Sequence, residues 1–91
     1  MKNESPYKHA QRLAYLTTVL IIQNNISRLR KCFVLAEKIY VTGNMEIKNA
    51  VVNVFLFSVS SFMEMNRPRF IDLLPKILRQ QYYRQVITFG I

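Results

Sequence analysis

Side chains that could support metal or cofactor chemistry are few and far apart. The chain has one histidine, His9, and one cysteine, Cys32, and they fall on different predicted helices. A zinc site needs about three or four Cys or His ligands at close spacing, so this pair does not predict one. A single cysteine also excludes an intramolecular disulfide and is typical of a reducing cytoplasm. We therefore expect no metal and no cofactor.

Catalytic groups are scattered in the same way. Ser58, Ser60 and Ser61 lie within an apolar stretch. A serine nucleophile needs a base within hydrogen-bond reach, and His9 lies about fifty residues upstream. Serines inside a helix more often bond back to their own backbone. The five acidic residues form no pair three or four apart, and two glycines are too few for a phosphate-binding loop. We expect that the chain is not an enzyme.

Basic residues are the most promising candidates for function. The chain has 13 Lys and Arg against 5 Asp and Glu, a net charge of +8. Arg28, Arg30 and Lys31 cluster at the predicted start of a helix, where the helix dipole disfavours cations. Arg67 and Arg69 form a second cluster. We interpret these five side chains as candidate partner-binding residues.

The positive charge leaves several classes of partner open. It attracts phosphate backbones, anionic lipid surfaces and acidic proteins, and it could also serve only to keep an apolar domain soluble. Nucleic-acid binding would require the cations to share one face, and no helix-turn-helix with a polar recognition helix is visible. The apolar fraction of 51% favours self-association. We expect a protein partner and a homodimer, with non-specific nucleic-acid binding as the alternative.

Helix caps and breaks predict the elements that carry these residues. At 91 residues the chain is expected to form a single domain, residues 1–91. Ser5 and Pro6 are typical of a helix start, and so are Asn66 and Pro68. Asn24-Asn25 indicates a break, and either asparagine could cap the helix that follows. The predicted helices are residues 6–23, 26–42, 45–63, 68–74 and 76–88. The expected fold is an all-α bundle of four to five helices built from antiparallel helical hairpins.

The third predicted helix, residues 45–63, is apolar on every side. This pattern predicts a central buried helix, with Asn49 and Asn53 buried and hydrogen-bonded. A membrane span needs about 20 apolar residues, and the fourteen of Ala50–Met63 are too few. We expect Gly43 to end the preceding helix in the left-handed conformation and Asn44 to cap this one. The two helices would then form an antiparallel hairpin.

Two stretches of the chain carry a resemblance to other proteins. The sequence AEKIYVTGN at 36–44, with KNAV at 48–51 and NVF at 53–55, resembles small uncharacterised bacterial helical proteins. The tail, with LLP at 73–75, QYY at 81–83 and ITFGI at 87–91, is similar to the ends of such chains. The resemblance covers about the last two thirds of the chain. It implies an all-α fold and a bacterial source, and it carries no activity and no site residue.

The sequence thus predicts a cytoplasmic helical bundle that acts as a non-catalytic protein-interaction module. An adaptor or immunity-type role is a hypothesis about its class only.

Overall fold

The computed structural model describes the backbone of residues 5–89 and the side chains of residues 5–86. Within that part the chain is helical, with short connections and no strand. The elements are α1 (Pro6–Ile22), α2 (Ile26–Thr42), α3 (Met45–Ala50), η1 (Val51–Leu56), α4 (Phe57–Asn66), η2 (Pro68–Leu73) and α5 (Lys76–Phe89). The predicted all-α fold is confirmed.

Three helices begin at the predicted capping residues. The side-chain oxygen of Ser5 accepts the backbone N–H three residues ahead at 3.3 Å, and that of Asn25 does the same at 3.3 Å. Asn44 caps α3 in the same way at 2.9 Å. Each bond satisfies one of the N–H groups that the first turn of a helix leaves unpaired. Local sequence therefore determines where α1, α2 and α3 start.

The two tight corners differ in how they turn the chain. Asn24, with φ 58°, takes the left-handed conformation between α1 and α2, and the predicted break there is confirmed. The prediction for Gly43 was wrong, because its φ of −83° and ψ of 163° are extended backbone. A lack of space explains why a glycine stands at position 43: a Cβ there would collide with the Ile47 side chain and lie 2.8 Å from the Ile39 carbonyl oxygen.

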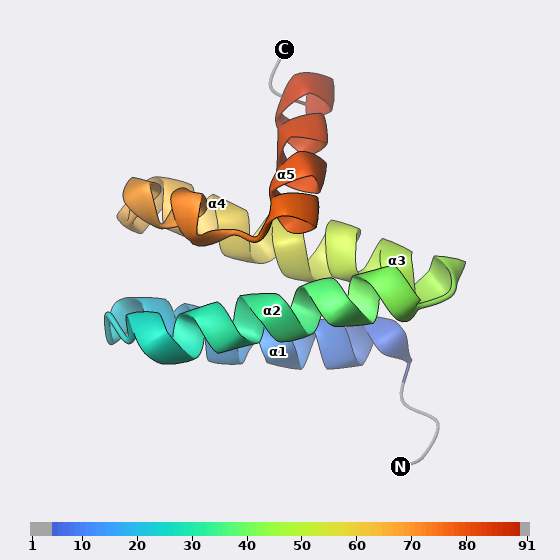
Figure 1. The fold of residues 1–91 in the computed structure, drawn as a ribbon, viewed down its shortest axis with the longest axis horizontal. Coiled ribbons are helices and arrows are strands. Elements are labelled where there is room, and N and C mark those ends of the chain that lie inside the picture. Colours follow the sequence, from blue (N-terminus) through green and yellow to red (C-terminus); the bar gives the residue numbers. More distant parts are fainter. Residues whose placement is uncertain (1–4, 90–91) are drawn as a thin grey trace.

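The elements α3, η1 and α4 follow one another without a break and form one long helix, from Met45 to Asn66 (Figure 1). It extends beyond the predicted end at residue 63, and it is not α-helical throughout. In η1 the N–H of Phe57 bonds to the carbonyl of Val52, five residues back, which is the wider π-helical turn. The α1 helix packs along all three segments, and α2 contacts α3 and η1.

The core lies between this long helix and the layer formed by α1 and α2. Its buried apolar residues are Ala10, Ala14, Ile21, Leu29, Phe33, Ala36, Ala50, Val51, Phe55, Leu56, Val59, Met63, Leu74 and Leu78. Two buried hydroxyl groups bond back within their own helices, Thr17 to the Leu13 carbonyl at 2.7 Å and Ser60 to the Phe57 carbonyl at 3.4 Å. The helix backbone therefore pairs these two hydroxyls, whereas the buried Nε of Arg79 has no hydrogen-bond partner among the described residues.

The prediction that the third helix is buried on every side was wrong. Asn49 and Asn53 are exposed rather than buried, and Phe57 is 53% exposed. The α1–α2 layer covers one side of the long helix and α5 contacts η1 and α4, so a third sector faces solvent. A short chain lacks enough elements to enclose one helix completely.

The C-terminal part is attached to this body by the buried side chains of Leu74 and Leu78 and by hydrogen bonds. The predicted fourth helix is a 3₁₀ helix, η2, and Asn66 does not cap it but ends α4, donating its amide to the Phe62 carbonyl at 2.9 Å. The α5 helix then rises away from the other helices (Figure 1). The hydrogen bonds that hold it are Ile77 N–H to Glu37 at 2.8 Å, Arg79 to the Asp72 and Leu74 carbonyls at 2.7 and 3.0 Å, Gln85 to the Val52 carbonyl at 2.8 Å, and the Tyr82 hydroxyl to Glu64. Among the described residues, no helix is both long enough and apolar enough to cross a bilayer.

Candidate functional site

The α2 helix carries an unbalanced charge on its exposed side. It has four basic side chains, at residues 28, 30, 31 and 38, and one acidic side chain, Glu37. Glu37 offsets one of these charges, but its carboxylate accepts the backbone N–H of Ile77 on α5 rather than pairing with one of the cations. In residues 5–86, the four basic side chains make no hydrogen bond or ion pair. Their charge is therefore available to a partner.

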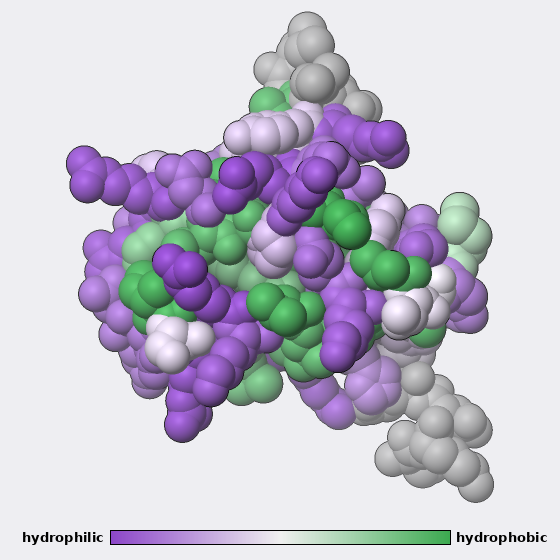
Figure 2. Space-filling view, in the orientation of Figure 1, coloured by the Kyte–Doolittle hydropathy of each residue, from purple (hydrophilic) through white to green (hydrophobic). Residues whose placement is uncertain are grey.

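Two hollows bring these cations next to apolar side chains. One, of about 340 Å³, is lined by Arg30, Lys31, Val34, Leu35 and Lys38. Val34 and Leu35 are 58% and 48% exposed there. We call the six residues Arg28, Arg30, Lys31, Val34, Leu35 and Lys38 the α2 basic face. In Figure 1, α2 lies in front of α1, and Figure 2, in the same orientation, shows apolar groups set among hydrophilic ones on the face toward the viewer.

The second hollow, of about 440 Å³, lies between α1 and α2. It is lined by Leu16, Val19, Leu20, Arg28, Lys31 and Cys32. Lys31 lines both hollows, so the structure brings the first predicted basic cluster together along α2. Sequence reasoning missed Lys38, Val34 and Leu35. The signal for them was helical spacing, because Val34 and Leu35 follow Lys31 by three and four residues and Lys38 follows these two by four and three.

The second predicted cluster does not join this surface. Arg67 follows α4 and lines a separate hollow with Ile21 and Ile22 at the end of α1. Arg69 is an exposed residue of η2, and neither arginine lines a hollow of the α2 basic face.

Other basic residues are used inside the fold. The Lys48 ammonium group donates to the Tyr40 carbonyl at 2.7 Å and lies 4.5 Å from the centre of the Tyr40 ring. It thereby pairs a carbonyl at the C-terminal end of α2, where the dipole favours a cation. Arg79 similarly pairs the carbonyl of Asp72 in η2 and that of Leu74, the residue after η2. Only part of the net charge is therefore left for binding.

The side chains considered for catalysis lie in different places. His9 lines a cavity between α1, α2 and α3, whereas Ser60 and Ser61 line a hollow between α4 and α5. Glu64 and Tyr82 line the latter hollow too, and burial together with the Glu64 carboxylate raises the pKa of Tyr82 to about 12. Within the described part of the chain, no three metal-ligating side chains come together.

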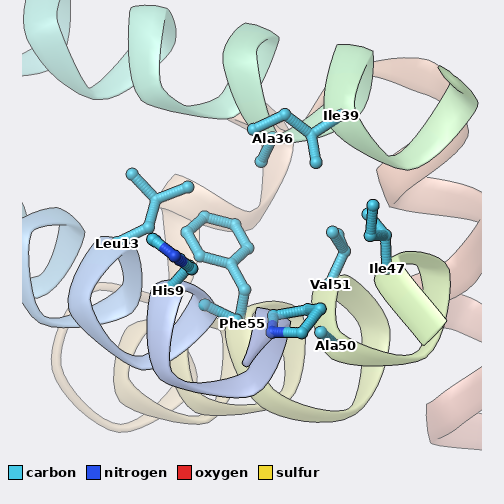
Figure 3. Close-up of a pocket in the computed structure, with 10 residues that line it drawn as sticks. His9, Leu13, Ala36, Ile39, Ile47, Ala50, Val51 and Phe55 are labelled. Atoms are coloured by element: carbon cyan, nitrogen blue, oxygen red, sulfur yellow. The ribbon is translucent and has the colours of Figure 1, made fainter. Parts of the chain in front are cut away.

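The cavity beside His9 is lined almost entirely by apolar side chains. It has a volume of about 240 Å³ and lies where α1, α2 and the long helix meet (Figure 3). Its lining residues are Pro6, His9, Ala10, Leu13, Ala36, Ile39, Ile47, Ala50, Val51 and Phe55. Sequence reasoning treated most of these residues as core, because a pattern of apolar positions does not show whether the packed side chains fill the space between them.

Comparisons with known proteins place the chain in a family. No curated protein and no solved structure matches it. Residues 1–88 match the family described as Domain of unknown function (DUF7674), which agrees with the expected uncharacterised family of small helical proteins. Since the match spans nearly the whole chain, this all-helical protein belongs to the DUF7674 family.

Proposed function

We propose that the chain is a non-catalytic interaction module that binds an acidic protein segment through the α2 basic face. The observation that carries this proposal is the hollow in which Val34 and Leu35 lie exposed among three cations. Protein interfaces combine an apolar centre with polar groups around it. Cations around apolar anchors suit a partner with the opposite charge, because complementary charge steers association and selects partners.

The composition of this surface favours a protein over a nucleic acid. A phosphate backbone would use the cations alone, and it would leave Val34 and Leu35 exposed to water. An amphipathic acidic segment would use both, since its apolar side chains bury these two residues while its carboxylates approach Lys31 and Lys38.

The test compares two equally acidic synthetic peptides, one amphipathic with leucine anchors and one without apolar residues. We expect the amphipathic peptide to bind and the other to bind about tenfold more weakly or worse. Charge reversal at Arg30, Lys31 and Lys38 to Glu should weaken binding by about tenfold or more. A matched variant that reverses Lys8, Arg69 and Arg84 to Glu has the same net charge and should bind like the natural chain.

Two results would overturn the proposal. An equal loss of peptide affinity in both triple variants would mean that the net charge of the protein attracts the peptide and that no defined surface binds it. Tighter binding to a random DNA duplex than to the peptide, falling steeply with salt, would establish the nucleic-acid alternative instead.

The homodimer, the cytoplasmic location and the adaptor or immunity-type role stay predictions. Light scattering during size exclusion tests the first of them.

A further inference from the structure

The cavity at the junction of α1, α2 and the long helix is a second candidate site. Figure 3 shows Leu13 of α1, Ile39 of α2 and Val51 of η1 around one common space. No residue of this cavity lines either hollow of the α2 basic face. What the cavity binds is therefore separate from the proposed protein interaction.

Small residues at the contact between three elements leave this space open. Ala10, Ala36 and Ala50 come one each from α1, α2 and α3, and they are 7%, 1% and 2% exposed. Phe55, also a lining residue, is 1% exposed. Because residues this deeply buried line it, the cavity reaches the core and is not a shallow surface depression. Protein cores normally fill such space with side chains.

The lining determines what kind of molecule the cavity suits. Nine of its ten residues are apolar, and His9 is the one with a polar side chain. A buried water molecule needs about two to four polar partners to stay in place. Apolar cavities of about 150 Å³ lack them, stay dry and bind benzene. A volume of about 240 Å³ is larger than that, yet below the range of about 300–1,000 Å³ typical of drug-sized ligands.

From these dimensions and this chemistry, we infer that the cavity binds a compact apolar molecule of about two fused rings. The ligand enters past Ile39, which is 36% exposed, and Ile47, which is half-buried. It packs against the three alanines and the Phe55 ring, and its binding comes from apolar contact rather than from charge.

The test uses indole as the probe and follows the methyl signals of Ile39, Ile47 and Val51 by NMR. We expect saturable shifts at these methyl groups in the natural chain. Ala36→Met extends a side chain into the cavity and should weaken indole binding by about tenfold or more. Val41→Met places the same side chain on an exposed position of α2 and should leave binding unchanged.

A second variant protects the test against failure of Ala36→Met to fold. Ile39→Trp covers the entrance from a partly exposed position, and it should also weaken indole binding by about tenfold. The inference is overturned if the natural chain shows no saturable shift, or if neither variant that folds weakens binding. It is also overturned if the methyl shifts follow protein concentration and not indole, because the cavity would then take a side chain from a second copy of the chain.

Discussion

Glu37 is predicted to stabilise α5 from a distance of forty positions in the sequence. Its carboxylate accepts the N–H of Ile77, the second residue of α5, at 2.8 Å. The first turn of α5 has no acidic residue of its own and starts with Lys76, which the positive end of the dipole disfavours. Glu37 therefore supplies both a hydrogen-bond acceptor and the missing negative charge.

The expected magnitude follows from these two contributions. A hydrogen bond to a charged group is worth about 1.5–3 kcal/mol, and a carboxylate at a helix start adds about 0.3–1 kcal/mol. Glu37 is only half-buried, so solvent reduces both values. We expect Glu37→Ala to cost about 1–2 kcal/mol, and Glu37→Gln, which keeps an acceptor oxygen, about half as much.

The assay is urea unfolding monitored by circular dichroism, together with amide hydrogen exchange along α5. In a thermal melt, a loss of this size would lower the melting temperature by about 4–16 °C for a chain of this length. Glu46→Ala is the matched control, because Glu46 lies in the first turn of α3, is exposed and accepts no hydrogen bond among those seen in residues 5–86. If Glu37→Ala costs no more than Glu46→Ala and leaves exchange in α5 unchanged, the reasoning is refuted.

Three further predictions concern single contacts. Gly43→Ala should destabilise the chain by about 1–3 kcal/mol because its Cβ meets Cγ2 of Ile47. In an Ile47→Ala background, which lacks Cγ2, the same change should cost less, and urea unfolding of the two single variants and the double variant checks it. Gln85→Ala should lower the free energy of unfolding by about 1 kcal/mol, because it removes the hydrogen bond to the Val52 carbonyl. Gln80→Ala, at an exposed position of α5, should lower it less, and equal melting temperatures of the two variants would contradict this prediction. The pKa of Tyr82 is raised from 10.0 to about 12, so its contribution to stability is complete below pH 10 and is lost as pH rises through 12. Tyr82→Phe should remove this component from the pH dependence of unfolding. An absorbance titration of the phenolates should then show one fewer tyrosine that ionises near pH 12.

Local signals were sufficient for much of the fold. Ser5, Asn25 and Asn44 each cap a helix because a short polar side chain reaches an N–H three residues ahead, and that geometry needs no tertiary contact. The break at Asn24 is equally local. Such features are visible in the sequence before any packing is known.

Features that depend on packing could not be predicted in this way. Glu37 caps a helix forty positions away, and the π-helical turn of η1 places Val52 so that its carbonyl also accepts the Gln85 amide. Gly43 shows the same limit, because the correct residue was singled out for the wrong reason: the corner needs space, not positive φ. Asn53 was placed inside because an apolar helix does not reveal which sector its neighbours leave uncovered.

Only the charged part of the α2 basic face could be predicted from the sequence, for a related reason. The charge of Arg28, Arg30 and Lys31 at a helix start is a sequence signal, but the exposure of Val34 and Leu35 among them is not. Helical spacing places Val34 and Leu35 on the same side of α2 as Lys31, but only the packed arrangement shows that no other element covers them.

The sides of α2 differ in what they contact. Leu29 and Phe33 pack into the core, Ala36 and Ile39 border the cavity, and Glu37 holds α5. The remaining side carries the cations and two exposed apolar residues. A charge excess that served only solubility would not require apolar side chains to lie uncovered between the cations, since these side chains oppose solubility. The combination is what a surface that binds an acidic, partly apolar partner requires.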